Sequence, residues 1–358
     1  MTVPKLRILF IGPRTFGYER EICREIELAG YQVDWFDERP SSSPLIKALI
    51  RVHPVLAAPL SNAYFDRIIS HSRTMDYKVV FVIKGEALSS EKLRDLRGAL
   101  PGARFIYYTW DSLKNVKNAS NKLHYFDKVY SFDRLDSSSD NRIRHLPLFY
   151  SNAYERLPQT VGGGVVASDI DLLLVASLHS DRYSVAQKIF RAARNAVPGF
   201  QICEYFYFQS RWVFALRKLL DPEFMLIPWA AVKWRALTPV QTLSLAARSQ
   251  ILVDIHHPGQ TGLTMRMMES VGAKKKIITT NPDVKNYEFY DPDNILIVDR
   301  GAPMIPVDFL RRPYRPLCDE IYRRYSLRSW LKEILSSVDV PSSQELHTLT
   351  TDSKSVEC

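Results

Sequence analysis

The sequence has few cysteines, no long apolar run and no familiar leader segment. The separations of its four cysteines match no metal-binding spacing and indicate a reducing cytosol without a zinc site; they are Cys23, Cys203, Cys318 and Cys358. No apolar run approaches the roughly 18 residues that a transmembrane helix needs. The apolar segment near the N-terminus lacks a small-residue cleavage pattern, so it predicts a first strand and not a signal peptide.

Acidic residues are fewer than basic ones, 39 against 48, which gives a net charge of +9 at pH 7. Nucleic acid, an anionic membrane surface or phosphorylated substrates would each explain such an excess. The densest basic clusters lie at residues 274–276, 311–315 and 323–328. No homeodomain, zinc-finger or RNA-recognition pattern accompanies them, so they do not favour nucleic acid as a partner.

The 358 residues are enough for two domains, and the composition, 46% hydrophobic and 24% charged, is typical of a soluble protein. Short apolar runs alternate with helical stretches in both halves, which predicts parallel βαβ units. Strands are expected at residues 6–11, 31–36, 78–83, 104–109, 128–132 and 144–149, and again at 171–176, 201–208, 225–228, 251–255, 277–280 and 294–298.

The composition changes at residues 151–168, which contain a proline and three consecutive glycines. The predicted organisation is therefore a Rossmann-like domain over residues 1–150, a linker over 151–168, a second Rossmann-like domain over 169–312, a helical region over 313–337 and a disordered tail over 338–358. Two such domains place the carboxyl ends of two parallel sheets around a central cleft, where ligands bind in folds of this kind.

The stretch TGLTMRMMESVGAKKKIITTN, residues 261–281, predicts a helix followed by a strand. A helix N-terminus offers unpaired N–H groups to a phosphate, with Thr261 as cap and Gly262 allowing close approach. Glu269, two turns later, would lie on the same face and accept hydrogen bonds from a ribose. The alternative is a tightly packed helix start and a solvated glutamate.

Several segments together resemble the GT-B glycosyltransferases, and more narrowly those of bacterial capsule, exopolysaccharide and lipopolysaccharide biosynthesis. They are residues 108–112, 126–133, 146–150 and 257–264, followed by Glu269, the lysine-rich turn and residues 277–280. The resemblance implies an acceptor domain, then a donor domain in which Glu269 binds the ribose. It implies a cytoplasmic enzyme with a nucleotide-sugar co-substrate, no metal cofactor and a glycan or lipid-linked glycan acceptor, with possible peripheral contact with the inner membrane.

Donor-binding candidates follow the strands of the second half. Arg182 would bind a diphosphate with two N–H groups, or it is a surface charge at a helix start. Asn281 begins a loop expected near the donor, although Asn-Pro-Asp is also a common turn. The full set is His179, Arg182, Gln260, Thr261, Gly262, Leu263, Thr264, Glu269 and Asn281.

Acceptor-binding candidates follow the first and third strands of the first half: Gly12, Arg14, Thr15, Gly17 and Lys84. The glycines do not complete a dinucleotide-binding fingerprint, so the sequence does not favour NAD binding. The alternative to an acceptor-binding loop at residues 12–17 is an ordinary strand–helix turn. Glu86 and Asp111 are the candidate catalytic bases for an inverting transfer. Asp111 is alternatively a helix cap or an ion-pair partner.

Three further features leave alternatives. Many retaining enzymes of this fold have two glutamates eight positions apart, and Thr261 stands at the first position, so retention and inversion both remain possible. The pair His256-His257 lacks a third metal ligand. The basic aromatic segment 314–335 predicts either a helix crossing back to the first domain or a face resting on anionic lipid.

A sugar-nucleotide epimerase and a non-catalytic assembly protein are the alternative functions.

Overall fold

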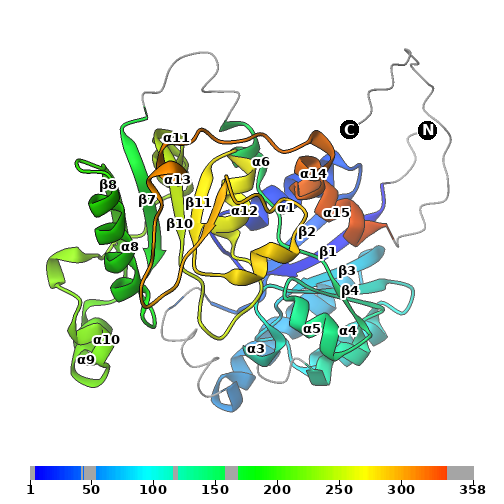
Figure 1. Cartoon of the computed structure of the whole chain (residues 1–358). Coiled ribbons are helices and arrows are strands. Elements are labelled where there is room, and N and C mark those ends of the chain that lie inside the picture. The colour runs from blue at the N-terminus through cyan, green and yellow to red at the C-terminus, as the bar shows by residue number, and fades with distance from the viewer. Residues whose placement is uncertain (1–4, 42, 44–53, 116–119, 158–167, 337–358) are drawn as a thin grey trace, which may run out of the picture.

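The computed structural model describes residues 5–41, 43, 54–115, 120–157 and 168–336. Within these residues the chain forms two six-stranded sheets, and every strand pairing in them is parallel (Figure 1). The two Rossmann-like domains predicted from the sequence are therefore confirmed. The described residues do not include residues 44–53, the glycine run of the predicted linker or the predicted tail at 338–358.

The first sheet has the strand order β2-β1-β3-β4-β5-β6. Its middle strands are continuous apolar runs because helices cover both faces of a parallel sheet; every residue of β1 after Arg7 is buried. Ser89 caps α4 by accepting a hydrogen bond from the Lys92 amide. The elements are β1 (Arg7–Gly12), α1 (Tyr18–Leu28), β2 (Gln32–Asp37), α3 (Pro54–Ser72), β3 (Tyr77–Ile83), α4 (Ser90–Ala99), β4 (Arg104–Thr109), η1 (Leu113–Asn115), η2 (Ser120–Tyr125), β5 (Lys128–Ser131), α5 (Arg134–Ser139) and β6 (Ile143–His145).

The second sheet has the order β12-β11-β10-β7-β8-β9. The strand predicted at residues 225–228 is wrong: Asp221 caps a short helix there, with Pro222 at its first position, and the edge strand follows later. The elements are β7 (Ile170–Ser177), α8 (Arg182–Ala196), β8 (Ile202–Tyr207), α9 (Arg211–Leu220), α10 (Pro222–Met225), η3 (Trp229–Ala231), β9 (Val232–Lys233), α11 (Pro239–Arg248), β10 (Ser249–Asp254), α12 (Met265–Gly272), β11 (Lys276–Thr279), η4 (Pro282–Asn286), β12 (Ile295–Ile297) and α13 (Val307–Arg311).

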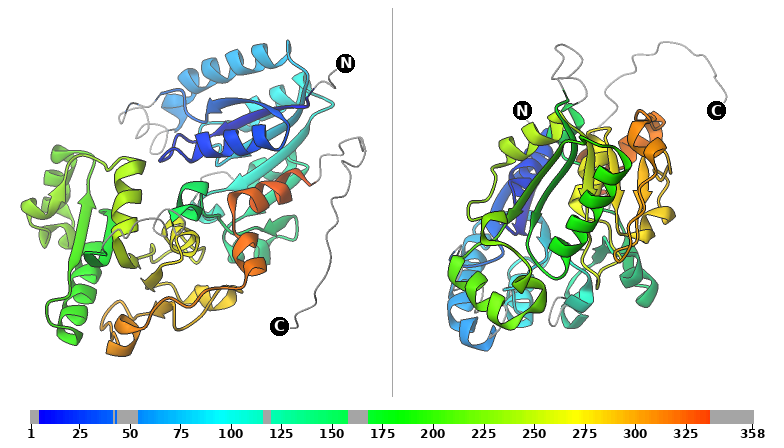
Figure 2. Two further views of the ribbon diagram at one scale, coloured as in Figure 1. Left: turned by 90° about the horizontal axis from the view of Figure 1, so that it is seen from above. Right: turned by 60° about the vertical axis from the view of Figure 1, so that its left-hand side comes forward.

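The chain crosses between the domains twice, at α6 (Asn152–Glu155) and again before α14 (Asp319–Arg324) and α15 (Leu327–Leu335). The final helix returns to the first domain and lies beside α1 (Figure 2). Tyr150 holds the two crossings together, because its N–H donates to the Tyr325 carbonyl and its C=O accepts from the Leu327 N–H. One apolar cluster, which includes Phe149 and Met267, runs through both domains.

The expectation that segment 314–335 presents aromatic side chains to lipid is wrong. Tyr322, Tyr325 and Trp330 are buried in the core that joins the domains. Arg324 and Arg328 are paired with Glu288 and Glu25, respectively. The segment is the returning helix of the alternative interpretation. In the part of the chain that the structure describes, no helix is both long and apolar enough to cross a membrane.

Candidate functional site between the two domains

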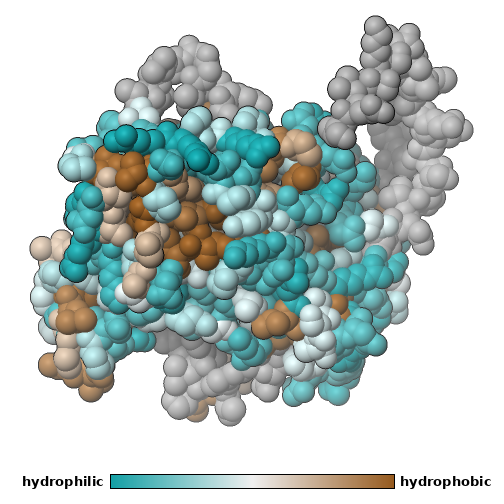
Figure 3. Space-filling model, in the orientation of Figure 1, coloured by the Kyte–Doolittle hydropathy of each residue, from teal (hydrophilic) through white to brown (hydrophobic). Residues whose placement is uncertain are grey.

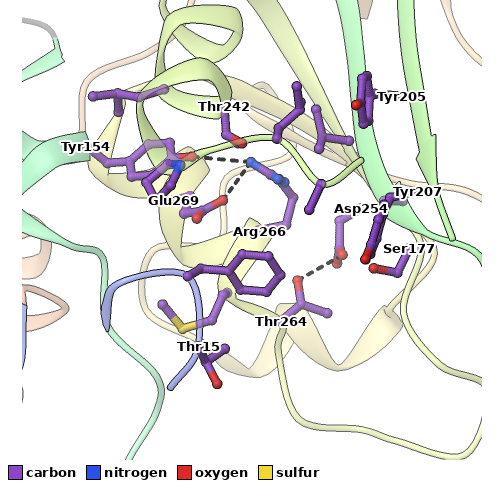
Figure 4. Close-up of a pocket in the computed structure, with 18 of the residues that line it drawn as sticks. Thr15, Tyr154, Ser177, Tyr205, Tyr207, Thr242, Asp254, Thr264, Arg266 and Glu269 are labelled. Carbon is purple, nitrogen blue, oxygen red and sulfur yellow. Dashed lines mark hydrogen bonds and ion pairs between the residues drawn. The ribbon is translucent and has the colours of Figure 1, made fainter. Parts of the chain in front are cut away.

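A cavity of about 480 Å³ lies between the domains (Figure 4). Its first-domain wall consists of the β1–α1 loop, the start of α1 and Trp110. Its second-domain wall consists of the carboxyl ends of β7 and β10, part of β8 and the first turns of α11 and α12. Apolar walls with a few convergent polar groups are typical of small-molecule sites of this size.

Arg182 is the first of the convergent polar groups. Its Nε donates to the carbonyl of Ile255 at 3.0 Å and its NH1 to the carbonyl of Ser177 at 3.0 Å, so it bridges the ends of β10 and β7. Withdrawal from water lowers the pKa of the guanidinium to about 10, which leaves it charged at neutral pH. Among the described residues it forms no ion pair with a carboxylate. The cavity wall therefore has a cation that is held by neutral groups.

The first turn of α12 lies on the same wall. Thr264 caps the helix by accepting from the Met267 amide at 3.2 Å, and its hydroxyl donates to Asp254 at 2.8 Å (Figure 4). Asp254 is buried, and this burial raises the pKa of its carboxyl. The N-terminus of a helix carries a partial positive charge. Thr264 thus connects the helix start to the end of β10 at the cavity.

Glu269 reaches the cavity one turn further along α12. It accepts a hydrogen bond from the Tyr18 hydroxyl at 2.5 Å. It also pairs with Arg266 at 2.6 Å (Figure 4). Burial, reinforced by the charge of Glu269, raises the pKa of Tyr18 well above its usual range. Arg266 also lies 3.5 Å from the Tyr154 hydroxyl. Glu269 is therefore a buried member of a network that includes both domains, not a solvated residue.

The helix expected to begin near Thr261 begins at Met265, and Thr264 is its cap, so the predicted cap was wrong by three residues. The Thr261 hydroxyl donates to Asp133 of the first domain at 2.5 Å, and the Gly262 amide also bonds to Asp133. A Cβ on Gly262 would lie 2.3 Å from the Phe132 ring. The space beside Gly262 is thus filled by first-domain side chains, and a phosphate finds no room there in this arrangement of the domains.

Four other predicted donor residues also lie away from the cavity. Leu263 is buried in the core that joins the domains. Asn281 donates to the Thr261 carbonyl at 2.9 Å and so stabilises the loop before α12. Gln260 donates to Asp111 at 3.3 Å across the domain interface. The His179 ring lies 5.5 Å from the His257 ring, with the two planes tilted by 37°, and burial next to Arg182 lowers the pKa of His179 to about 3.

Charged side chains also gather where the first-domain strands end. Lys84 pairs with Asp111 at 2.6 Å, and Arg39 pairs with Glu86 at 2.7 Å. The structure therefore brings Lys84 and the candidate base Asp111 together, while Glu86 belongs to a neighbouring pair. Because Asp111 also contacts Gln260, it is the candidate base that lies closer to the second domain.

The β1–α1 loop reaches the cavity through Thr15 and the adjacent Phe16. The other candidates there have structural roles. Gly12 packs against the Phe10 ring, where a Cβ would lie 2.7 Å from a ring carbon. The Arg14 guanidinium lies over the Trp35 ring, 5.3 Å from its centroid. Gly17 has a φ of 86° at the N-cap of α1, a conformation that favours glycine.

Backbone strain is concentrated at the same edges of the sheets. Phe16, Lys84 and Ser180 have positive φ values of 51°, 66° and 44°. They follow β1, β3 and β7, respectively, and each such residue costs about 1–3 kcal/mol unless its surroundings impose the conformation. Strained residues of this kind are common at ligand-binding sites, so they support the choice of these loops as functional.

The polar groups at and beside the cavity include five residues that were not among the predicted site residues. Asp133 and Asp254 follow or end predicted strands, and Arg266 precedes Glu269 by one helical turn, so strand ends and helical spacing are signals that point to these three. Tyr18 and Tyr154 give no such signal, because their partners Glu269 and Arg266 are 251 and 112 positions away in the sequence.

In the described part of the chain, no three His, Cys, Asp or Glu side chains lie close enough together to bind one metal ion. The His256 ring nitrogen Nδ1 instead lies 2.7 Å from the Thr280 hydroxyl. Burial, together with the charge of Arg300, lowers the pKa of His256 to about 4. This histidine is a neutral structural residue at the end of β10.

No family model matches the sequence, and no curated protein does. Solved structures do match the fold. The HepE protein of Anabaena, solved with UDP and glucose, aligns with a TM-score of 0.54 at 11% identity over 93% of this chain and 99% of its own. A glycosyltransferase of Rickettsia africae aligns with a TM-score of 0.55 at 13% identity, over 94% of this chain and 100% of its own. The UDP-GlcNAc 2-epimerase of Methanocaldococcus jannaschii aligns with a TM-score of 0.50 at 12% identity, over 92% of this chain and 99% of its own. The chain therefore has the two-domain GT-B fold.

Proposed function

We propose that the protein is a glycosyltransferase that uses a nucleotide sugar, whose diphosphate binds in the interdomain cavity. The observation that carries the proposal is Arg182, a charged guanidinium on the cavity wall that forms no ion pair within the described residues. The carboxylates of Asp254 and Asp181 lie near enough to offset part of the pKa lowering that burial causes, but neither forms an ion pair with it, so a ligand anion would supply the direct partner that the guanidinium lacks. A diphosphate suits it, because guanidinium groups bind phosphate oxygens through two N–H groups.

The first turn of α12 would supply the second positive contribution. Thr264 to Arg266 line the cavity, so the partial charge of the helix start lies on the same wall as Arg182. These groups would stabilise the negative charge that develops on the departing diphosphate, and we propose no metal cofactor. Support for a nucleotide diphosphate also comes from the neighbours of the same fold, of which HepE was solved with UDP.

Glu269 would hold the ribose of the donor. Its carboxylate lines the cavity and already accepts a hydroxyl hydrogen bond, from Tyr18 at 2.5 Å. Ribose hydroxyls are chemically equivalent donors, so the sugar would replace Tyr18 or share the carboxylate with it. Arg266 pairs with the carboxylate at 2.6 Å and orients it. Movement of α1 relative to α12 would then accompany donor binding.

The acceptor would enter along the first-domain loops, past Thr15 and Lys84. Asp111 is the proposed base of an inverting transfer, with Glu86 as the second candidate, because Asp111 contacts the second domain. As in the resembling enzymes, the acceptor we propose is a growing bacterial surface polysaccharide or a lipid-linked glycan, used in the cytoplasm.

Product analysis tests the function directly. The chain is incubated with a panel of nucleotide sugars, with and without oligosaccharide acceptors, and free nucleoside diphosphate and extended glycan are measured. The proposal predicts one donor that yields both products. A donor that is isomerised without an acceptor would identify an epimerase, and binding without any turnover across the panel would identify an assembly protein.

A further inference from the structure

The second domain displays an exposed apolar face on α9. It consists of Trp212, Val213, Leu216, Leu219 and Leu220, which we call the α9 face. Their spacing places all five on one side of the helix. Trp212, Leu219 and Leu220 have exposed fractions of 85%, 74% and 73%, values that are unusual for large apolar side chains grouped on one helix.

Helices α9 and α10 form a hairpin that holds α9 with this face pointing outward. Phe214, on the opposite side of the helix, is fully buried against Phe208 and Phe224. Lys218 Nζ donates to the carbonyls of Phe224, Met225 and Ile227 at 3.1, 2.9 and 2.7 Å and thereby ties α9 to α10. The apolar side chains are therefore presented by a hairpin that these contacts hold together, and in the described part of the chain they remain exposed.

The apolar surface continues onto the turn that follows. Met225 and Leu226 at the end of α10, and Trp229 in η3, are also exposed. In the space-filling view, apolar residues gather at the lower left, where Figure 1 places α9 and α10 (Figure 3). None of these residues lines the interdomain cavity.

The charges around this surface are mainly basic. Residues 208–235 contain five basic side chains (Arg211, Arg217, Lys218, Lys233 and Arg235) and two acidic ones. Both acidic side chains have roles within the hairpin and its support. Asp221 caps α10, and Glu223 accepts from Ser184 at 2.8 Å. Arg217 pairs with Asp221 at 3.6 Å and Lys218 is bonded within the hairpin, so the basic rim of the α9 face consists of Arg211, Lys233 and Arg235.

We propose that the α9–α10 hairpin docks on an anionic membrane surface. Leucine and tryptophan on one helix face, flanked by arginine and lysine, are the composition of helices that lie in the membrane interface. The basic rim would meet the headgroups of acidic lipids, each such residue adding to the attraction. This surface, and not segment 314–335, would hold the protein at the bilayer. The proposal rests on the hairpin alone and does not depend on the proposed transferase activity.

Vesicle co-sedimentation tests the docking with the full chain. Vesicles of phosphatidylglycerol and phosphatidylethanolamine are compared with vesicles of phosphatidylcholine, without nucleotide sugar. We expect binding to the anionic vesicles only, weakened by salt. The double variant Leu216→Ser/Leu219→Ser is expected to lower the partition coefficient by about tenfold or more, because buried apolar area drives interfacial binding. The variant Lys233→Gln/Arg235→Gln is expected to lower it less and to reduce its salt dependence.

The matched control is Leu135→Ser/Met304→Ser, which removes two exposed apolar side chains elsewhere on the surface. It is expected to bind vesicles as the wild-type chain does. Equal binding by the α9 double variant and the wild-type chain, or equal binding to neutral vesicles, would overturn the proposal. Self-association of the wild-type chain that disappears in the α9 double variant would also overturn it, because the face would then belong to a second copy of the chain.

Discussion

The loop edges of the two sheets hold their charges differently. At the first-domain edge, Lys84 is paired with Asp111 and Arg39 with Glu86. At the second-domain edge, Arg182 is held by two backbone carbonyls, with no ion pair among the described residues. Both edges face the interdomain region, but among the described residues only Arg182 places a cation without an ion pair on the cavity wall, where the nearby carboxylates of Asp254 and Asp181 offset part of the pKa lowering that burial causes.

This difference suggests how one fold handles two ligands. A cluster whose charges neutralise one another presents hydrogen-bonding groups without a net field, which suits the hydroxyls of a neutral glycan. An unpaired guanidinium at a helix start attracts an anion. We therefore propose that the acceptor binds at the first domain and the nucleotide diphosphate at the second, and the following predictions test that division.

The largest effect is expected at the first-domain edge. The substitution Asp111→Asn removes the proposed base and is expected to lower kcat by about 10²–10⁴-fold. The affinity for nucleoside diphosphate is expected to stay unchanged, because Asp111 does not line the cavity. Steady-state kinetics and calorimetry measure the two quantities. Glu86→Gln serves as the matched comparison and should lower kcat less; the reverse order would assign the base to Glu86.

A smaller effect is expected for Glu269, at the second-domain edge. The change Glu269→Ala removes the proposed ribose contact and leaves Arg266 buried without its partner. We expect donor affinity to fall by about 10–100-fold and the free energy of unfolding to fall by about 3 kcal/mol. Calorimetric titration and urea denaturation measure these two changes.

The control for this prediction is Tyr18→Phe, which removes the hydroxyl that bonds Glu269 but keeps the pair between Glu269 and Arg266. Donor affinity should then stay the same or rise, since the carboxylate becomes available to the ribose. If Glu269→Ala binds the donor as tightly as the wild-type chain does, Glu269 is only a structural residue.

The third prediction concerns the domain interface. A Cβ on Gly262 would lie 2.3 Å from the Phe132 ring, so Gly262→Ala is expected to destabilise the fold by about 1–3 kcal/mol. Thermal or urea denaturation measures this loss. The second change Phe132→Leu should restore part of the stability by making room. Without such rescue, and with diphosphate affinity lowered instead, the original assignment of Gly262 to a phosphate would stand.

The smallest effect is a dependence of stability on pH. His256 has a folded pKa of about 4, below the value of about 6.5 in an unfolded chain, so the folded state favours the neutral ring. Its contribution is complete above pH ~6.5 and is lost as the pH falls towards 4. Between pH 6.5 and 5.5 the loss is expected to be about 1 kcal/mol. His256→Gln should reduce this slope in urea denaturation but leave the part due to His179, whose pKa is lowered to about 3, whereas the exposed control His124→Gln should leave the slope as it is.

Much of the fold was predictable from local sequence because the signals are local. Buried parallel strands are apolar runs, and the caps at Ser89 and Thr238 follow from residue type and position. The failures occurred where a competing local signal or a distant partner decided the structure. Residues 225–228 look like a strand but follow a capped helix that buries Phe224.

The candidate site was predictable only in part for the same reason. Arg182, Thr264 and Glu269 were found from their positions after strands and on one helix, and all three line the cavity. Thr261 and Gly262 were placed at the helix start, but Asp133 of the other domain occupies their hydrogen-bonding groups. No pattern within the stretch 261–281 shows a carboxylate 128 positions away.

The most direct test of the central claim is calorimetric titration of the chain with UDP, GDP and ADP, repeated with Arg182→Gln. The account predicts binding of one of these nucleotides, weakened about 30-fold or more in the variant through the loss of charge-assisted hydrogen bonds. The control Arg248→Gln, which breaks an exposed ion pair with Asp169, should bind as the wild-type chain does. Equal affinity in the wild-type chain and Arg182→Gln would contradict the account.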